Sequence, residues 1–191
     1  TVDRWVIDRV FSHMRDVISV SAPGEQQRMT YAINLSGTTL NDDQFSTYVE
    51  QLLQRYELPP QMICFEITET AAITNLGNAG RLIRQLKDIG CRFALDDFGV
   101  GFSSYGYLKN LPIDFVKIDG HFVKDILDDP LDLAIVESIN HIGSVIGIRT
   151  IAEWVENEAI LEKLRQIGVD YAQGYALSIP EPIPAVVQRV A

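Results

Sequence analysis

The chain has 191 residues, with 16 lysines and arginines against 26 aspartates and glutamates, and so carries a formal net charge of −10. This excess of acid argues against a groove for long nucleic acid, which needs many basic side chains, but not against a small anionic substrate held through divalent cations. No apolar run reaches the roughly 18 residues of a membrane span and no signal peptide is visible. We therefore expect a cytoplasmic domain, with any membrane anchor in upstream segments, and we expect Cys64 and Cys91 to be reduced core thiols.

Helical stretches and short apolar runs alternate along the chain. Amphipathic spacing predicts helices over 1–19, 42–56, 76–89, 131–147 and 157–167. In the first of these, Trp5 is expected to face inward. Asp42 and Asn157 are predicted N-caps, and Gly90 and Gly168 are predicted to end their helices.

The apolar runs predict strands that are buried on both faces. They are short and rich in Ile, Val, Phe and Tyr, and they cover 29–35, 62–67, 91–95, 113–118, 149–152 and 171–176. Repeated alternation of strand and helix indicates a parallel sheet with helices outside it, and hence an α/β fold.

Nearly every predicted strand ends in a polar residue. These residues are Asn34, Glu66, Asp96 with Asp97, Lys117 with Asp119, Glu153 and Gln173. Polar groups at many successive strand ends are typical of the mouth of a (β/α)8 barrel, whereas a doubly wound sheet concentrates its site at one switch point. Because only six strands are visible, we predict a TIM-like (β/α)8 barrel that lacks its first two strands, within one N-terminally incomplete domain over 1–191.

The strand-end acids suggest a metal centre. Glu66, Asp96, Asp97 and Glu153, together with the amide of Asn34, form an all-oxygen set that suits Mg²⁺ or Mn²⁺ better than zinc. Carboxylates that converge without a cation repel one another, and two ions would relieve this while clamping a phosphate.

Asp96 and Asp97 are adjacent, so strand alternation would point them to opposite faces. We expect the strand to end there, because Gly99 and Gly101 permit a sharp turn. Lys117 lies inside an apolar strand with Asp119 as its expected partner, either as a structural ion pair or as a cation beside water or phosphate.

Two other groups of residues have less specific readings. His13, His121 and His141 are interpreted as surface or ordinary core residues. For Phe102, Tyr105 and Tyr107, which follow the glycines, stacking on a base and simple packing both remain open.

The chain resembles the EAL-domain family, whose members are bacterial phosphodiesterases of cyclic di-GMP. The resemblance spans nearly the whole chain and rests on six motifs in order: Asn34-Leu35-Ser36, Glu66-Ile67-Thr68-Glu69, Asp96-Asp97-Phe98-Gly99-Val100-Gly101-Phe102-Ser103-Ser104, Lys117-Ile118-Asp119, Ala152-Glu153-Trp154-Val155-Glu156 and Gln173-Gly174-Tyr175. It implies hydrolysis of one phosphodiester of cyclic di-GMP to linear pGpG, with two Mg²⁺ or Mn²⁺ ions. It also implies a homodimer, and an upstream sensor or cyclase-like domain in the full-length protein.

The resemblance implies a role for each matched residue. Asn34, Glu66 and Asp96 would bind the first metal, and Asp96 would bridge to the second, which Asp97 holds. The remaining implied roles are metal ligand or general base for Glu153, water orientation or charge stabilisation for Lys117, support of Lys117 for Asp119, loop anchoring for Glu69, and substrate binding for Gln173 and Glu156.

The chain departs from the family pattern in two places. The Glu-Ala-Leu segment that names the family is absent, since Glu158-Ala159-Ile160 falls in a predicted helix, so one ligand is missing and we expect these 191 residues alone to be a poor enzyme. The basic residue that often precedes a proline after Gln173-Gly174-Tyr175 is also absent from Leu177-Ser178-Ile179-Pro180.

Two alternatives to the phosphodiesterase remain. One is a catalytically silent receptor for cyclic di-GMP, although the chain keeps every expected carboxylate that it is long enough to contain. The other is an enolase-like barrel with Lys117 as base, although adjacent Asp96 and Asp97 fit two metals better than one.

Overall fold

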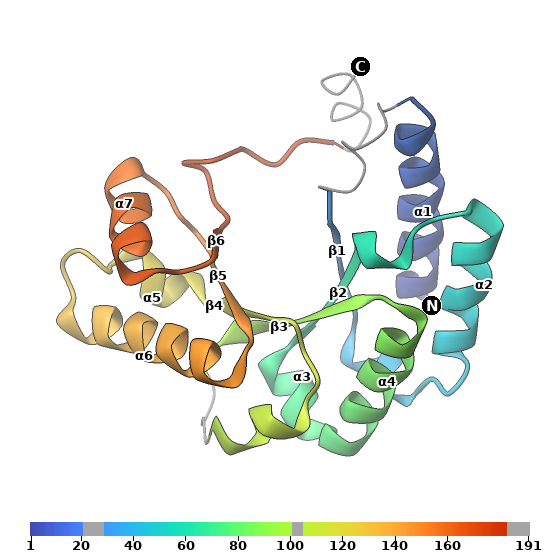
Figure 1. Cartoon of the computed structure of the whole chain (residues 1–191), viewed down its shortest axis with the longest axis horizontal. Coiled ribbons are helices and arrows are strands. Elements are labelled where there is room, and N and C mark those ends of the chain that lie inside the picture. The colour runs from blue at the N-terminus through green and yellow to red at the C-terminus, as the bar shows by residue number, and fades with distance from the viewer. Residues whose placement is uncertain (21–28, 101–104, 183–191) are drawn as a thin grey trace. The chain divides into compact units, whose positions relative to one another are not determined.

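The computed structural model of the chain describes residues 1–20, 29–100 and 105–182 (Figure 1). In chain order the elements are α1 (Val2–Val20), β1 (Tyr31–Asn34), η2 (Gly37–Asn41), α2 (Phe45–Tyr56), η3 (Pro60–Met62), β2 (Ile63–Thr68), α3 (Glu69–Thr74), α4 (Leu76–Ile89), β3 (Arg92–Phe98), η4 (Tyr105–Asn110), β4 (Phe115–Ile118), α5 (Gly120–Lys124), α6 (Pro130–Ile146), β5 (Arg149–Ala152), α7 (Glu158–Ile167) and β6 (Tyr171–Ala172).

The strands form one parallel sheet in the order β1-β2-β3-β4-β5-β6. Neighbours in the sheet are therefore neighbours in sequence, which is the strand order of a (β/α)8 barrel. The predicted α/β fold is confirmed, and the described residues supply six of the eight strands that a complete barrel has. No helix in the described ranges is long and apolar enough to span a membrane.

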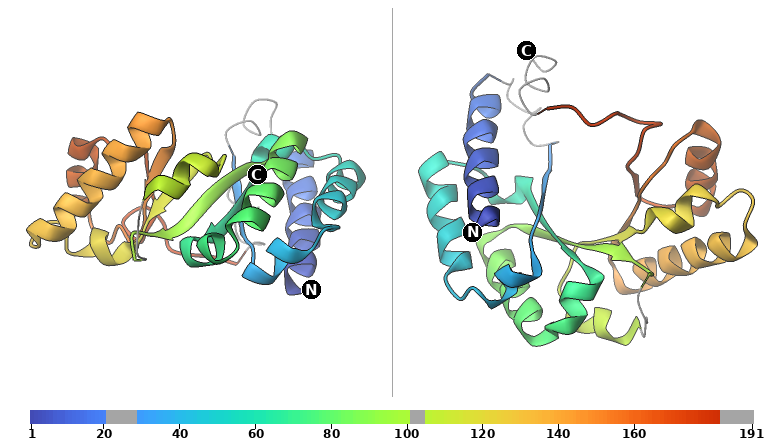
Figure 2. Two further views of the ribbon diagram at one scale, coloured as in Figure 1. Left: turned by 90° about the horizontal axis from the view of Figure 1, so that it is seen from below. Right: turned by 180° about the vertical axis from the view of Figure 1, so that it is seen from behind.

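The chain divides into two compact units, of which the first contains residues 1–66, 75–93 and the segment from 180 onward. In this unit α1 lies beside α2 in both views of Figure 2. The inward face of α1 is formed by Ile7, Phe11, Met14 and Val17. The prediction that Trp5 faces inward is wrong: its side chain is 63% exposed, because it lies about 200° around the helix from Ile7.

The second unit contains residues 67–74 and 94–179. Its longest helix, α6, packs against α5, β4 and β5 (Figure 1). This helix begins where the Asp129 side chain accepts hydrogen bonds from the backbone N of Leu131 and Asp132. It ends at Gly147, where a φ of 78° suits glycine.

Most predicted helix ends are confirmed. Asn157 caps α7 by accepting a hydrogen bond from N of Ile160 at 3.0 Å, and Gly90 and Gly168 end α4 and α7 with φ of 107° and 85°. Asp42 is not the N-cap of α2, which begins at Phe45. Its carboxylate instead accepts a hydrogen bond from N of Gln44 and pairs with Arg4 at 2.7 Å.

Both cysteines are buried, as predicted. Burial raises the pKa of the Cys91 thiol to about 12. A thiol with so high a pKa is held in its unreactive form.

Candidate metal centre

In the second unit, the carboxyl ends of β3, β4 and β5 lie side by side. The ladder continues past the strands, since N of Asp119 donates to O of Phe98 at 3.3 Å and N of Glu153 donates to O of Ile118 at 3.2 Å. This alignment gathers three of the predicted ligands: carboxylate oxygens of Asp96, Asp97 and Glu153 lie within 4.8 Å of one another.

A bulge brings the two adjacent aspartates to one site. We expected the strand to end at Asp97, but β3 continues to Phe98, and its pairing with β4 shifts register between Leu95 and Phe98. Within this irregularity Asp97 adopts the left-handed conformation with a φ of 53°, which Asp tolerates better than most residues. The bulge breaks the alternation that would have separated the two carboxylates.

Lys117 places a positive charge inside the cluster. Its Nζ lies 2.9 Å from Oδ1 of Asp96 and 2.9 Å from Oε1 of Glu153, and the residue is only 4% exposed. The sequence did not predict these two ion pairs, and the expected pairing with Asp119 stays a prediction. Asp119 accepts hydrogen bonds from N and Nδ1 of His121, at 2.8 and 2.7 Å.

His121 and Trp154 form an aromatic pair beside Asp119. Their rings are 4.9 Å apart, and both side chains are largely exposed. Trp154 has a φ of 53°, and its ring lies so close to Gly120 that a Cβ there would be 2.2 Å away. Of the two interpretations given for His121, surface or ordinary core, its exposed side chain fits the first, but no local pattern in the sequence predicted its partners.

The donor set fits a divalent cation. Among the described residues, Oδ1 of Asp96 is buried without a hydrogen bond, although it faces Lys117 in the ion pair. Burial raises the pKa of Asp97, and the charges of Asp96 and Asp119 raise it further. A hard cation with oxygen ligands would satisfy the buried oxygen and neutralise this excess of negative charge.

Asn34 and Glu66 are paired within the first unit. Asn34, the last residue of β1, is the register partner of Glu66 within β2, so in a parallel pair their side chains lie on the same face. N of Leu35 donates to O of Glu66 at 2.8 Å directly after this pair. Their role as metal ligands stays a prediction.

Glu69 is the first residue of α3 and is 1% exposed. Its Oε2 accepts a hydrogen bond from N of Gly99 at 3.1 Å, and its Oε1 accepts one from the hydroxyl of Tyr107 at 2.5 Å. Burial raises the pKa of Tyr107, and the Glu69 carboxylate raises it further. The sequence did not reveal Tyr107 as a partner of Glu69, because 38 residues separate them.

Gln173 and Glu156 are exposed near the end of β5. The backbone N of Gln173 donates to the backbone O of Ala152 at 2.8 Å, and the backbone O of Gln173 accepts from N of Val155 at 3.0 Å. Gly174 permits this approach, since a Cβ there would lie 2.3 Å from N of Val155. The role of Gln173 and Glu156 in substrate binding stays a prediction. Phe102 lies in the segment 101–104, outside the described residues.

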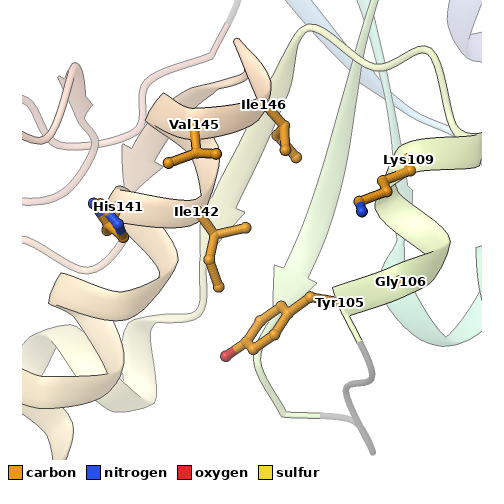
Figure 3. Close-up of a pocket in the computed structure, with 7 residues that line it drawn as sticks. All are labelled: Tyr105, Gly106, Lys109, His141, Ile142, Val145 and Ile146. Carbon is orange, nitrogen blue, oxygen red and sulfur yellow. The ribbon is translucent and has the colours of Figure 1, made fainter.

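A pocket of about 410 Å³ lies between η4 and α6 (Figure 3). Figure 3 shows Ile142 and Ile146 of α6 directed toward the side of η4 that carries Tyr105 and Lys109. None of the lining residues is a predicted ligand or catalytic residue, so the acidic cluster and this pocket are separate features.

Comparison with known proteins identifies the family. The EAL domain matches residues 1–180. The chain belongs to the EAL domain family. This EAL domain is 48% identical over 158 residues to the cyclic di-GMP phosphodiesterase PdeB of Shewanella oneidensis, covering 83% of the chain and 18% of PdeB. It is 38% identical over 183 residues to the cyclic di-GMP phosphodiesterase PdeF of Escherichia coli, covering 96% of the chain and 24% of PdeF. It thus spans about a quarter or less of these relatives.

Solved structures of the family share the fold. The PaMucR phosphodiesterase in complex with c-di-GMP superposes with a TM-score of 0.89 at 32% identity, covering 97% of this EAL domain and 73% of that chain. The EAL domain of Mycobacterium smegmatis DcpA gives a TM-score of 0.91 at 30% identity, covering 99% and 83%. The TIM-like architecture predicted from the strand ends is therefore confirmed.

Proposed function

We propose that this chain is the catalytic domain of a metal-dependent phosphodiesterase, which hydrolyses cyclic di-GMP to linear pGpG in bacterial signalling. The observation that carries the proposal is the cluster of Asp96, Asp97 and Glu153 around the buried ammonium of Lys117. The names of PdeB and PdeF, and the c-di-GMP bound to PaMucR, support the choice of substrate.

The proposed ligands divide between two ions, Mg²⁺ or Mn²⁺. Asn34, Glu66 and Asp96 would hold the first, and Asp96 and Asp97 would hold the second, with Glu153 nearby as ligand or general base. When bound, such ions neutralise the phosphate and lower the pKa of a coordinated water. The all-oxygen donor set and the buried Oδ1 of Asp96 support this assignment.

The protein's own residues supply the rest of the chemistry. As general base, Glu153 would take a proton from the attacking water, whose oxygen bonds to phosphorus as one bond from phosphorus to a ribose oxygen breaks. The released ribose oxygen would then take up a proton from Glu153 or solvent water and leave as a hydroxyl. Lys117 would hold Glu153 and Asp96 in place and stabilise the negative charge that develops on the phosphate. Gln173 and Glu156 would bind the dinucleotide, Asp119 would fix His121 beside the site, and Glu69 would anchor the backbone at Gly99.

We further propose that the domain acts as a homodimer within a longer protein that carries an upstream sensor or cyclase-like domain. The small share of PdeB and PdeF that the chain covers supports the longer protein. The name of a relative from Pseudomonas aeruginosa, the bifunctional diguanylate cyclase/cyclic di-GMP phosphodiesterase MucR, supports a cyclase-like neighbour.

Asp96→Asn tests the proposal. In the longer protein that contains this domain, loss of the bridging charge should reduce hydrolysis of cyclic di-GMP, with Mg²⁺ or Mn²⁺ present, below detection. Asp88→Asn, at an exposed position of α4, is the matched control and should leave turnover unchanged. Unchanged hydrolysis in Asp96→Asn would contradict the two-metal assignment. Tight binding of cyclic di-GMP without any hydrolysis by the unsubstituted longer protein would favour the silent receptor instead.

A further inference from the structure

A buried aspartate in the first turn of α1 holds the segment that follows β1. Asp3 is 9% exposed, and its Oδ2 accepts hydrogen bonds from N of Ser36 at 2.9 Å, Oγ of Ser36 at 2.8 Å and Oγ1 of Thr39 at 2.5 Å. These partners lie 33 and 36 residues along the chain, within the same compact unit. Burying a carboxylate is unfavourable unless its hydrogen bonds are satisfied, and bonds to a charged acceptor are stronger than neutral ones.

The first turn of α1 holds this segment at both ends. Asp3 binds its start at Ser36, and the neighbouring Arg4 pairs with Asp42 directly after η2. Ser36 and Thr38 also share a hydrogen bond between their hydroxyls at 2.7 Å. The result is a network that fixes the backbone from residue 36 to residue 42.

The segment begins two residues after Asn34, the proposed metal ligand. In the described part of the chain, β1 has four residues and pairs with a single neighbour, β2. On that side the backbone is held by the bond from N of Leu35 to O of Glu66. The next amide, of Ser36, donates to Asp3. Asn34 is thus followed by one bond to β2 and one to α1.

We propose that Asp3 is a positioning residue for the metal centre, which orients Asn34 by fixing Ser36; this inference rests on the proposed metal-dependent function. Asn34 brings a neutral amide oxygen to the ion, so its contribution depends on being held in place before the ion arrives. Partners that orient a ligand typically change metal affinity by about 10–100-fold when they are removed.

Asp3→Ala tests the inference, with Asp8→Ala as the matched control. Asp8 lies on the same helix and also accepts a hydrogen bond, from the hydroxyl of Tyr56 at 3.0 Å, but it has no bond to residues 36–42 among the described contacts. The readout is Mn²⁺ binding by calorimetry without substrate, at a temperature where thermal scans show every variant folded. We expect Asp3→Ala to lower the affinity for Mn²⁺ by about 10–100-fold relative to the unsubstituted protein. Asn34→Ala should lower the same affinity, whereas Asp8→Ala should keep it within about twofold.

Further variants separate positioning from general loss of stability. Asp3→Asn keeps one acceptor oxygen and should recover part of the Mn²⁺ affinity. Ser36→Ala and Thr39→Val each remove one hydroxyl donor while keeping the carboxylate, and each should weaken binding less than Asp3→Ala does. Asp3→Ala combined with Asn34→Ala should bind Mn²⁺ no worse than Asn34→Ala alone.

The possible failures are distinguishable. One outcome is that Asp3→Ala binds Mn²⁺ as tightly as Asp8→Ala does, while Asn34→Ala binds it more weakly. That result would overturn the role of Asp3 and leave the proposed function intact. Unchanged Mn²⁺ binding in both Asn34→Ala and Asp96→Asn would overturn the metal centre itself, and with it this inference.

Discussion

A buried lysine offsets part of the negative charge of the acidic cluster. Lys117 lies between carboxylates of Asp96 and Glu153, and none of the three side chains is more than 13% exposed. Removing one member of a buried ion pair leaves an uncompensated charge in a medium that solvates it poorly. Lys117 therefore serves the folded state as well as the proposed reaction.

We predict that Lys117→Met lowers the free energy of unfolding by about 3–5 kcal/mol. The measurement is urea unfolding followed by circular dichroism, with EDTA and then with Mn²⁺, which should restore part of the loss by supplying positive charge. Lys124→Met is the control: Lys124 and Asp125 are 3.5 Å apart but exposed, so the change should stay within about 0.5 kcal/mol. Equal stability of the two variants would show that the buried pair contributes nothing.

At the level of elements, a carboxylate at the start of α3 holds two segments of the second unit. Glu69 accepts one hydrogen bond from the end of β3, at Gly99, and one from η4, at Tyr107. Because the carboxylate is almost fully buried, each donor that it loses leaves part of its charge unsatisfied.

We predict that Tyr107→Phe destabilises the protein by about 1.5–3 kcal/mol, the range for hydrogen bonds to charged groups. Tyr105→Phe is the matched control, because it removes the hydroxyl of a residue that is 36% exposed and keeps the ring, whose centroid lies 5.9 Å from that of Phe98. Chemical denaturation of both variants gives the comparison. A loss of stability in Tyr107→Phe no larger than in Tyr105→Phe would contradict a strong bond to Glu69.

The sequence predicted which elements exist better than it predicted how their ends are shaped. Hydrophobic period and glycine placement located α4 at its observed bounds. The predicted strand ends located Asp96 and Glu153 at the site, because parallel strands end at the same edge of a sheet. This common edge is set by the backbone and does not depend on side-chain conformation. The bulge that brings Asp97 beside Asp96 and Glu153 could not be read from the sequence, because it depends on how β3 pairs with β4.

Side-chain partners far apart in sequence were the other gap. The sequence matched Lys117 with the nearby Asp119 and did not reveal its ion pairs with Asp96 and Glu153, which come from the two neighbouring strands. Asp3 and Tyr107 each bond a residue more than 30 positions away. Neither period nor spacing carries such information, since it depends on which side chains the fold brings together.

At the scale of the whole molecule, the proposed function and the stability of the fold oppose each other. The chain has a net charge of −10, and its proposed site concentrates carboxylates further. Burial, Asp96 and Asp119 raise the pKa of Asp97 above its ordinary value. A carboxyl with a raised folded-state pKa destabilises the fold above that pKa, and the penalty disappears as the pH falls through it.

We predict that Asp97→Asn changes stability in opposite directions with and without metal. With EDTA at pH 7 it should raise the melting temperature, since it removes a repelled charge while Asn tolerates the φ of 53°. This gain should shrink as the pH falls, because the raised pKa lets the native Asp97 carboxyl take up a proton at a higher pH than an ordinary aspartate does. With Mn²⁺ at 100 times its dissociation constant, binding stabilises the unsubstituted protein by about 2.7 kcal/mol, and a variant that lacks a ligand should gain less.

Asp132→Asn removes another carboxyl with a raised pKa, outside the cluster, and should show no metal dependence of its effect. Calorimetric melting curves from pH 4 to 8, recorded with EDTA and with Mn²⁺, test whether the effect of Asp97→Asn on stability changes sign. If Asp97→Asn gains as much from Mn²⁺ as the unsubstituted protein does, Asp97 is not a ligand.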